Sequence, residues 1–271
     1  MSDWRQLAAP AKLNLALVVG PVRPDGKHEV ATVLERLTLA DTVSVREAAS
    51  VRVDGFEDDT IVRTALEALQ SHVGRSFEAR IDKRIPVAAG LGGGSSDAAA
   101  ALRLANDLLP APLAPPVLES IAASLGADVP FFLRDGPQLA TGDGTTLEPI
   151  AVPRDHAVLL VLPTGAVKSS TANVYAAFDA RNGSRGFDGR RAELLRALRG
   201  LGTLAGLAAL PPNDLASSPL AERLRELGAI RADVTGAGPV VYGLFPDRGA
   251  ADGARAVLGD RIAGAWIAEP G

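Results

Sequence analysis

One segment, residues 86–97, constrains the fold of this chain more than any other. It holds four glycines in five positions, Gly90 and Gly92 to Gly94, and ends in two serines and an aspartate. Glycine is costly to order, but it lets backbone N–H groups approach a ligand closely. We expect a short strand before the segment, over 79–85, and an alanine-rich helix after it, over 98–107. This arrangement favours phosphate binding, although a flexible loop capped by Ser or Asp is an alternative.

The glycine segment does not fit three better-known phosphate-binding patterns. It lacks the Gly-Lys-Ser/Thr of a Walker A loop. The chain has no His-Arg-Asp or Asp-Phe-Gly element, which excludes a protein kinase. A dinucleotide-binding fold would require a cleaner Gly-x-Gly-x-x-Gly with an acidic residue about 20 positions later. A different nucleotide-binding architecture is therefore favoured.

Composition excludes several other classes of protein. A chain of 271 residues with 47% hydrophobic residues and net charge −4 is expected to form a globular fold. The absence of cysteine excludes disulfides, zinc-thiolate sites and cysteine nucleophiles. Because 28 basic residues are outnumbered by 32 acidic ones, we expect no nucleic-acid partner. No stretch approaches the roughly 20 apolar residues of a membrane span, and no signal pattern begins the chain. We therefore expect a soluble, cytoplasmic protein with no membrane partner.

Strand-like and helix-like segments alternate in both halves of the chain, which predicts an α+β fold. Strands are expected over 12–19, 42–46, 157–162 and 240–245, and helices over 59–73 and 116–125, with another helical stretch opening at 211–215. The sequence changes in character near Pro149 and Pro153. We therefore predict two domains, 1–152 and 153–271.

Polar residues interrupt the apolar segments at three places. Lys12 and Asn14 lie on the same face of the predicted strand 12–19, about 7 Å apart, and require either solvent or a ligand. Lys27 and His28 follow a Pro-Asp-Gly turn and are expected at a loop tip. Asp128 follows Gly126, where it is either a helix cap or a functional carboxylate.

The chain resembles the GHMP family of small-molecule kinases in several blocks, which occur in the expected order along nearly the whole sequence. The most specific block is Gly-Leu-Gly-Gly-Gly-Ser-Ser-Asp-Ala-Ala over 90–99. The other matching blocks are Pro10–Leu15, Asp25–Glu29, Gly126–Phe132, Asn213–Leu215 and Thr235–Gly238.

The resemblance implies a two-lobed fold, with a GHMP kinase N-terminal α/β domain that carries the glycine loop and a ferredoxin-like C-terminal domain. It implies an enzyme that uses ATP and Mg²⁺ to phosphorylate an alcohol. Asp128 would accept the proton of the substrate hydroxyl. Lys12 would keep that carboxylate ionised and stabilise charge on the transferred phosphoryl group. Ser95 is the candidate magnesium ligand. The residues implied in ATP binding are Pro86, Val87, Ala88, Ala89, Gly90, Leu91, Gly92, Gly93, Gly94, Ser95, Ser96 and Asp97.

Within the family, the blocks agree with the branch that phosphorylates the 2-hydroxyl group of a cytidine diphosphate conjugate of methylerythritol, in non-mevalonate isoprenoid synthesis. Asn14 would contact the sugar alcohol, and His28 would recognise the edge of the cytosine ring. Thr171 and Tyr175 would contribute a substrate contact and a ring that stacks on the base. Lys27 departs from the family pattern, which has a second stacking tyrosine there; the Lys27 stem could cover the base and its ammonium group could reach a diphosphate.

Two other functions remain open at this stage. One is a GHMP kinase that acts on another alcohol or sugar, and the other is a non-catalytic nucleotide sensor with the same fold. The chain is expected to act as a monomer or a homodimer.

Overall fold

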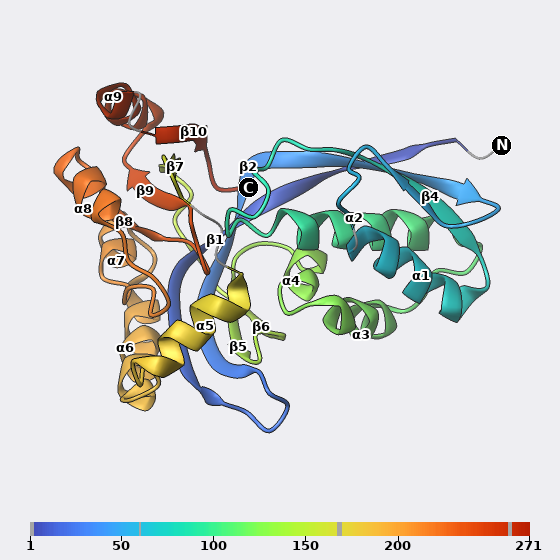
Figure 1. Ribbon diagram of the computed structural model, residues 1–271, viewed down its shortest axis with the longest axis horizontal. Helices are drawn as coiled ribbons and strands as arrows, with labels where there is room; N and C mark the ends of the chain where they lie inside the picture. The colour runs from blue at the N-terminus through green and yellow to red at the C-terminus, as the bar shows by residue number, and fades with distance from the viewer. Residues whose placement is uncertain (1–2, 60, 167–169, 260–261) are drawn as a thin grey trace. The chain divides into compact units, whose positions relative to one another are not determined.

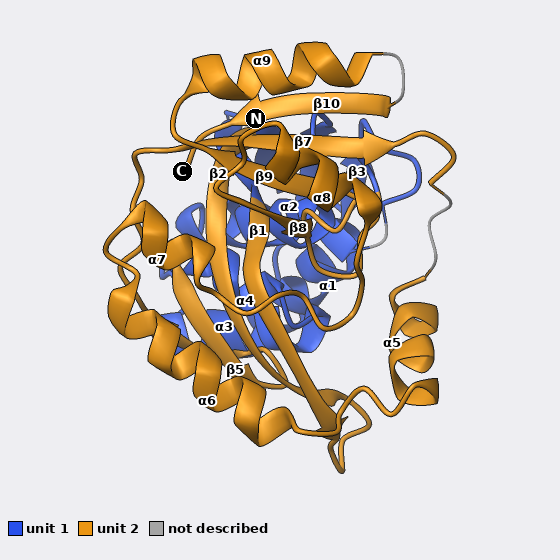
Figure 2. Cartoon of the chain, turned by 90° about the vertical axis from the view of Figure 1, so that its left-hand side faces the viewer, with its two compact units in different colours: residues 1–11, 40–87, 92–135 blue, residues 12–39, 88–91, 136–271 orange. Residues whose placement is uncertain are grey.

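The computed structural model describes residues 3–59, 61–166, 170–259 and 262–271. The chain divides into two compact units, which are not successive stretches of sequence. Unit 1 comprises residues 1–11, 40–87 and 92–135, and unit 2 comprises 12–39, 88–91 and 136–271 (Figure 2). The predicted boundary between residues 152 and 153 stays a prediction.

Two long strands run through both units. They are β1 (Arg5–Val22) and β2 (His28–Ala48), and they pair with each other (Figure 1). β1 contains the strand expected over 12–19, and β2 contains the strand expected over 42–46. Residues 11–20 of β1 are all buried, on both faces of the strand.

In unit 1, the second half of β2 forms a sheet with two further strands. Thr42 to Ala48 pair antiparallel with β4 (Ser76–Asp82), and β3 (Arg52–Asp54) pairs parallel with β4. The described residues of this unit also form four helices: α1 (Ile61–Val73), α2 (Gly93–Asp107), α3 (Pro115–Leu125) and α4 (Val129–Leu133). The alanine-rich α2 is buried on most sides, since small side chains let neighbouring elements approach it closely.

In unit 2, the first half of β2 pairs antiparallel with β5 (Gln138–Gly142), which pairs with β6 (Thr146–Pro149). A second sheet is antiparallel throughout, in the order β10-β7-β9-β8. Its strands are β7 (Ala157–Pro163), β8 (Arg231–Val234), β9 (Val241–Phe245) and β10 (Ile262–Ala268). The other elements among the described residues of this unit are α5 (Thr171–Ala180), α6 (Phe187–Ala197), the 3₁₀ turn η1 (Leu198–Gly200), α7 (Leu204–Ala208), α8 (Pro219–Glu226) and α9 (Arg248–Leu258).

The second sheet has the ferredoxin-like order of strands, and two helices pack on it. Alternate residues of β7, Ala157, Leu159 and Val161, join side chains of α8 and α9 in one apolar core. The α+β prediction is confirmed by these mixed sheets and helices.

Candidate active site

Lys12 and Asn14 form a buried polar pair on β1 in unit 2. Both are 4% exposed, and the Lys12 ammonium group donates a hydrogen bond to Asn14 Oδ1. Asn14 Nδ2 donates in turn to Thr32 Oγ1 at 2.8 Å. The shared strand face predicted from the sequence is therefore confirmed, and the alternative of a face in open solvent is wrong. Burial of a lysine side chain is rare, which makes Lys12 a candidate for a functional role.

The first part of the glycine segment, residues 88–91, is fixed to β1 and to a turn at 235–238 within unit 2. The backbone N–H of Lys12 donates to Leu91 O at 2.9 Å, and that of Val240 donates to Ala89 O at 3.3 Å. Gly90 has a φ of +83°, and a Cβ there would come 2.4 Å from Thr235 O. Only glycine fits so close a backbone contact.

The second part of the segment is helical, which differs from the sequence prediction. Helix α2 begins at Gly93 rather than at 98, so the residues expected to end the loop form its first turn and a half. Gly92 occupies the N-cap position in the left-handed conformation, and no side chain in the described part of the chain caps the helix. Ser95 and Asp97 lie within the helix rather than at its N-cap position. The backbone amides of a helix's first turn are suited to binding an anion.

Lys83 forms ion pairs with Asp41 and with Asp97 of α2 in unit 1. Lys83 Nζ donates to Asp97 Oδ2 at 2.8 Å and also to Asp41 Oδ2, and Asp41 Oδ1 accepts from the backbone N–H of Ile85 at 2.8 Å. Burial raises the pKa of Asp97 to about 7, although hydrogen bonding to Lys83 opposes the shift. Burial lowers the pKa of Lys83, but the two carboxylates outweigh it and the net shift is upward.

In the part of the chain that the structure describes, two side-chain oxygens in the first turns of α2 have no hydrogen-bond partner. Among the described residues, the Ser96 hydroxyl oxygen and Asp97 Oδ1 are buried without a hydrogen bond. Such groups are destabilising unless a ligand, ion or water satisfies them. The start of α2 is therefore suited to a polar ligand on two counts, its backbone amides and these side chains.

Asp128 lies at the N-cap position of α4 in unit 1 and is partly exposed. Its side chain makes no capping hydrogen bond to the described first turn of that helix. The alternative in which Asp128 is a helix cap therefore loses its main support.

His28 begins β2 and joins an aromatic cluster on α5 in unit 2. Its ring lies 4.7 Å from that of Tyr175 and 6.0 Å from that of Phe178, measured between centroids. Its Nε2 lies 2.9 Å from Asp179 Oδ1. The structure thus brings together two predicted residues, His28 and Tyr175. Thr171 is exposed at the start of the same helix, one turn before Tyr175.

Lys27 points to a different partner. Its ammonium group donates to Asp143 Oδ2 at 2.6 Å, in the turn between β5 and β6, and its side chain is 49% exposed. Burial would raise the pKa of Asp143, but hydrogen bonds from Lys27 and Thr145 lower it to about 2. Asp143 therefore stays ionised, and the ion pair holds Lys27 at this turn.

The described part of the chain offers no cluster of three His, Asp or Glu side chains that could hold a metal ion. Mg²⁺ is often held by one or two protein groups together with phosphate oxygens and water, which requires no such cluster. None of the helices that the structure describes has the length and apolar character needed to span a membrane.

Sequence reasoning missed Asp41, Lys83, Phe178 and Asp179. Phe178 and Asp179 come three and four positions after Tyr175, so the helical period of α5 could have placed them on the same face. Asp41 and Lys83 are 42 positions apart, and no local pattern joins them.

The comparisons with known proteins agree across the chain. Residues 60–136 match the family model for the GHMP kinases N terminal domain, and residues 190–263 match the model for the GHMP kinases C terminal domain.

Relatives and a solved structure extend this agreement. A 4-diphosphocytidyl-2-C-methyl-D-erythritol kinase from Gloeobacter violaceus is 39% identical, over 93% of this chain and 89% of its own length. A kinase of the same name from Anaeromyxobacter sp. strain K is 40% identical, over 94% of this chain and 85% of its own. A crystal structure of 4-(cytidine 5'-diphospho)-2C-methyl-D-erythritol kinase is similar with a TM-score of 0.78 at 30% identity, covering 98% of this chain and 100% of that chain.

Proposed function

The chain belongs to the GHMP kinases, and on this basis we propose that it transfers the γ-phosphoryl group of ATP to the 2-hydroxyl group of 4-diphosphocytidyl-2-C-methyl-D-erythritol. The resemblance seen in the sequence and the two-lobed α+β fold it implied are confirmed by the matching family models and relatives. The observation that carries the proposal is that Lys12 on β1 is buried and that its backbone is hydrogen-bonded to the glycine segment at Leu91.

ATP binding is assigned to residues 86–97. The amides at the start of α2 and the positive end of its dipole attract the polyphosphate. Val87 is 59% exposed and available to a ligand. Ala88 and Gly90 have φ values of +63° and +83°, so the backbone turns sharply next to Ala89 and Leu91, whose carbonyls accept hydrogen bonds from Val240 and Lys12.

The chemical step needs positioning and charge stabilisation. The oxygen of the 2-hydroxyl attacks the γ-phosphorus while the bond from that phosphorus to the β,γ-bridging oxygen breaks, and ADP leaves. The hydroxyl proton passes to the Asp128 carboxylate, which acts as general base. The Lys12 ammonium group stabilises negative charge on the phosphoryl oxygens, and Asn14 orients both Lys12 and the substrate.

Magnesium is a finer part of the proposal. The Ser95 hydroxyl and the unpartnered oxygen of Ser96 lie at the start of α2, where the phosphates are expected, and these oxygen donors suit the ion. When bound, Mg²⁺ supplies charge neutralisation on the phosphates. Ser95 would hold the ion together with phosphate oxygens of ATP.

Recognition of the cytosine base is assigned to the cluster on α5. Tyr175 offers a ring for stacking, and Asp179 orients the His28 imidazole so that it can hydrogen-bond the base edge. Thr171 adds a hydroxyl at the start of α5 for the substrate. The reaction is assigned to the cytoplasm, with the chain acting as a monomer or a homodimer.

One observation favours a second substrate. Lys27 stands where the family has a stacking tyrosine, and its charge is engaged by Asp143. A GHMP kinase that acts on an alcohol without a pyrimidine would not need the second stacking ring.

A substrate panel separates the two. The purified chain is incubated with Mg-ATP and, in turn, the cytidine substrate, mevalonate, homoserine and a free sugar, and ADP release is followed with product mass. The highest kcat/KM is expected for the cytidine substrate. Faster turnover of another alcohol would make that alcohol the assigned substrate. ATP binding without phosphoryl transfer to any compound of the panel would indicate a nucleotide sensor.

A further inference from the structure

The turn at residues 235–238 packs against the candidate catalytic lysine, Lys12, in unit 2. Thr235 Oγ1 accepts a hydrogen bond from the Asn14 backbone N–H at 3.1 Å. A Cβ added to Gly236 would come within 3.3 Å of both Lys12 Nζ and Asn14 Oδ1. The position of this turn therefore limits where the Lys12 ammonium group can lie.

One side chain from a distant part of the sequence holds this turn. Asn213 Nδ2 donates to Gly236 O at 2.7 Å and to Val234 O at 2.9 Å. Its Oδ1 accepts from the Leu215 N–H at 2.8 Å, and the residue is only 8% exposed. All the hydrogen-bonding groups of this amide are thus engaged, and two of its three bonds go to the carbonyls on either side of Thr235.

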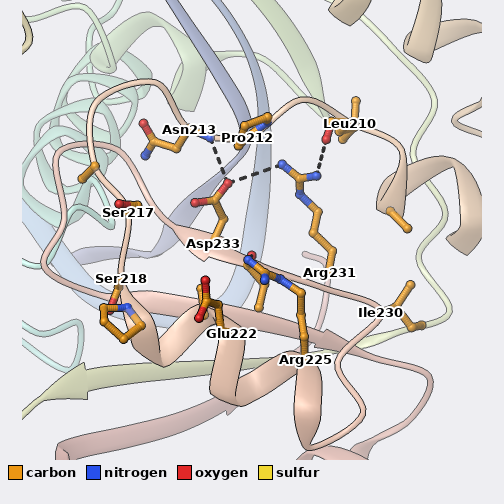
Figure 3. A pocket seen from close by; sticks show the side chains of 15 residues that line it. Leu210, Pro212, Asn213, Ser217, Ser218, Glu222, Arg225, Ile230, Arg231 and Asp233 are labelled. Carbon is orange, nitrogen blue, oxygen red and sulfur yellow. Dashed lines mark hydrogen bonds and ion pairs between the residues drawn. The ribbon is translucent and has the colours of Figure 1, made fainter. Parts of the chain in front are cut away.

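Asn213 is itself fixed by two buried charged residues, as Figure 3 shows. Its backbone N–H donates to Asp233 Oδ2 at 2.8 Å, and Arg231 lies 3.6 Å from the same oxygen. Arg231 also donates to the carbonyls of Leu210 and Pro211, which lie just before Asn213 in the sequence. A bonded route therefore runs from Arg231 through Asp233 and Asn213 to Gly236.

The same arginine reaches the strand that carries the lysine. Arg231 Nε donates to the Tyr242 hydroxyl at 2.9 Å, and that hydroxyl donates to Leu15 O on β1 at 3.0 Å. The turn and the strand are therefore held to a common buried anchor. Buried polar networks in which every member is satisfied favour one rigid arrangement.

We propose that Asn213 is a positioning residue for phosphoryl transfer, because it holds the Gly236 carbonyl and with it the turn that lies against Lys12 and Asn14. The inference rests on the proposed function. Asn213 touches neither substrate nor ATP in this proposal, and it acts through the turn. A displacement of about 1 Å in a positioning group can lower turnover by about 100-fold.

The test compares the same chemical change at two buried asparagines. Asn213→Asp keeps an oxygen for the Leu215 N–H but removes both donors to the turn. Asn106→Asp is the matched control. Asn106 lies near the end of α2 and is 7% exposed, and its side-chain amide hydrogen-bonds the backbone C=O and N–H groups of Leu113. Asn213→Ala removes the donors without adding a charge beside Asp233.

Both Asn213 variants are expected to lower kcat for the cytidine substrate by about 10- to 100-fold, with KM values for ATP and substrate within about threefold, because binding groups remain in place. The Asn106 variant should keep kcat within about threefold. Amide hydrogen exchange over residues 233–240 should accelerate only in the Asn213 variants.

Wild-type kcat in either folded Asn213 variant would overturn the proposal, as would unchanged exchange over 233–240. A loss of kcat equal to that of the Asn106 variant would reduce Asn213 to a structural role and equally overturn it. Should the wild-type chain phosphorylate none of the panel, the proposed function fails, and the exchange measurement still decides whether Asn213 holds the turn.

Discussion

Asp97 gives a prediction about stability that follows directly from its surroundings. The residue is 1% exposed near the start of α2, and burial raises the pKa of its carboxyl group from 3.8 to about 7 in the folded chain. Replacement by Asn mimics the protonated carboxyl, because the amide oxygen can still accept the hydrogen bond from Lys83 while the negative charge is removed.

The magnitude follows from the size of the shift. A shift of about three pKa units, at roughly 1.4 kcal/mol per unit, means that protonated Asp97 stabilises the folded chain by about 4 kcal/mol relative to ionised Asp97. Because the folded pKa is above the unfolded one, this stabilisation is fully present below about pH 4 and is lost as the pH rises toward 7. The free energy of unfolding of Asp97→Asn, relative to wild type, should therefore increase by about 1.4 kcal/mol per pH unit across this window.

Urea denaturation of both proteins at several values between pH 4.5 and 8 measures this difference. Asp82→Asn is the control, since the Asp82 side chain is 66% exposed in the same unit, and its difference from wild type should vary little with pH. A difference between Asp97→Asn and wild type that stays flat from pH 4.5 to 7 would refute the reasoning, because Asp97 would then titrate alike in the folded and unfolded chains.

Three further predictions concern ligand binding and a second buried acid. Lys27→Tyr should lower KM for the cytidine substrate, because base stacking is worth about 1–3 kcal/mol; an unchanged or higher KM counts against the stacking argument. Ser95→Ala should raise KM for Mg-ATP several-fold in steady-state kinetics, and no change in KM or magnesium dependence would remove Ser95 from the site. Burial raises the pKa of Glu35, although His156 opposes this. The melting temperature of Glu35→Gln relative to wild type should therefore rise from pH 5 to 8, and a constant difference would contradict the assigned shift.

Local patterns were sufficient to predict several features of the fold and site. Apolar alternation placed a strand over 12–19 and put Lys12 and Asn14 on one face, where their side chains bond to each other. Apolar periodicity and Gly126 placed a helix over 116–125, and the structure has α3 at Pro115–Leu125. These features depend on residues close together in the sequence, so a short window contains the information.

Two helix boundaries were wrong for identifiable reasons. Gly93 and Gly94 were expected in the loop because glycine disfavours helices. In the structure a Cβ on Gly93 would come 3.2 Å from both Lys83 Nζ and Ile85 Cγ2, so close packing favours glycine inside α2. No helix opens at 211–215, because Asn213 bonds to Leu215 and to the distant turn instead; helix α8 begins at Pro219.

Contacts across long sequence separations lay beyond the reach of sequence reasoning. His28 and Asp179 are 151 positions apart, and Asn213 and Gly236 are 23 apart. Nothing local to either partner indicates such a pairing, since it arises only when strands and helices pack. The assigned roles of Lys12, Asp128 and the other site residues stay predictions.

The most direct test of the central claim is a transfer assay on wild type, Asp128→Asn and Lys12→Ala with Mg-ATP and 4-diphosphocytidyl-2-C-methyl-D-erythritol. The position of the new phosphate is read by ³¹P and ¹³C NMR, and nucleotide binding is measured by calorimetry. The account predicts a phosphate on the 2-hydroxyl with wild type, and turnover lower by about 10²–10⁴-fold in Asp128→Asn with ATP binding retained. Full turnover in Asp128→Asn, or phosphate at another position, would contradict it.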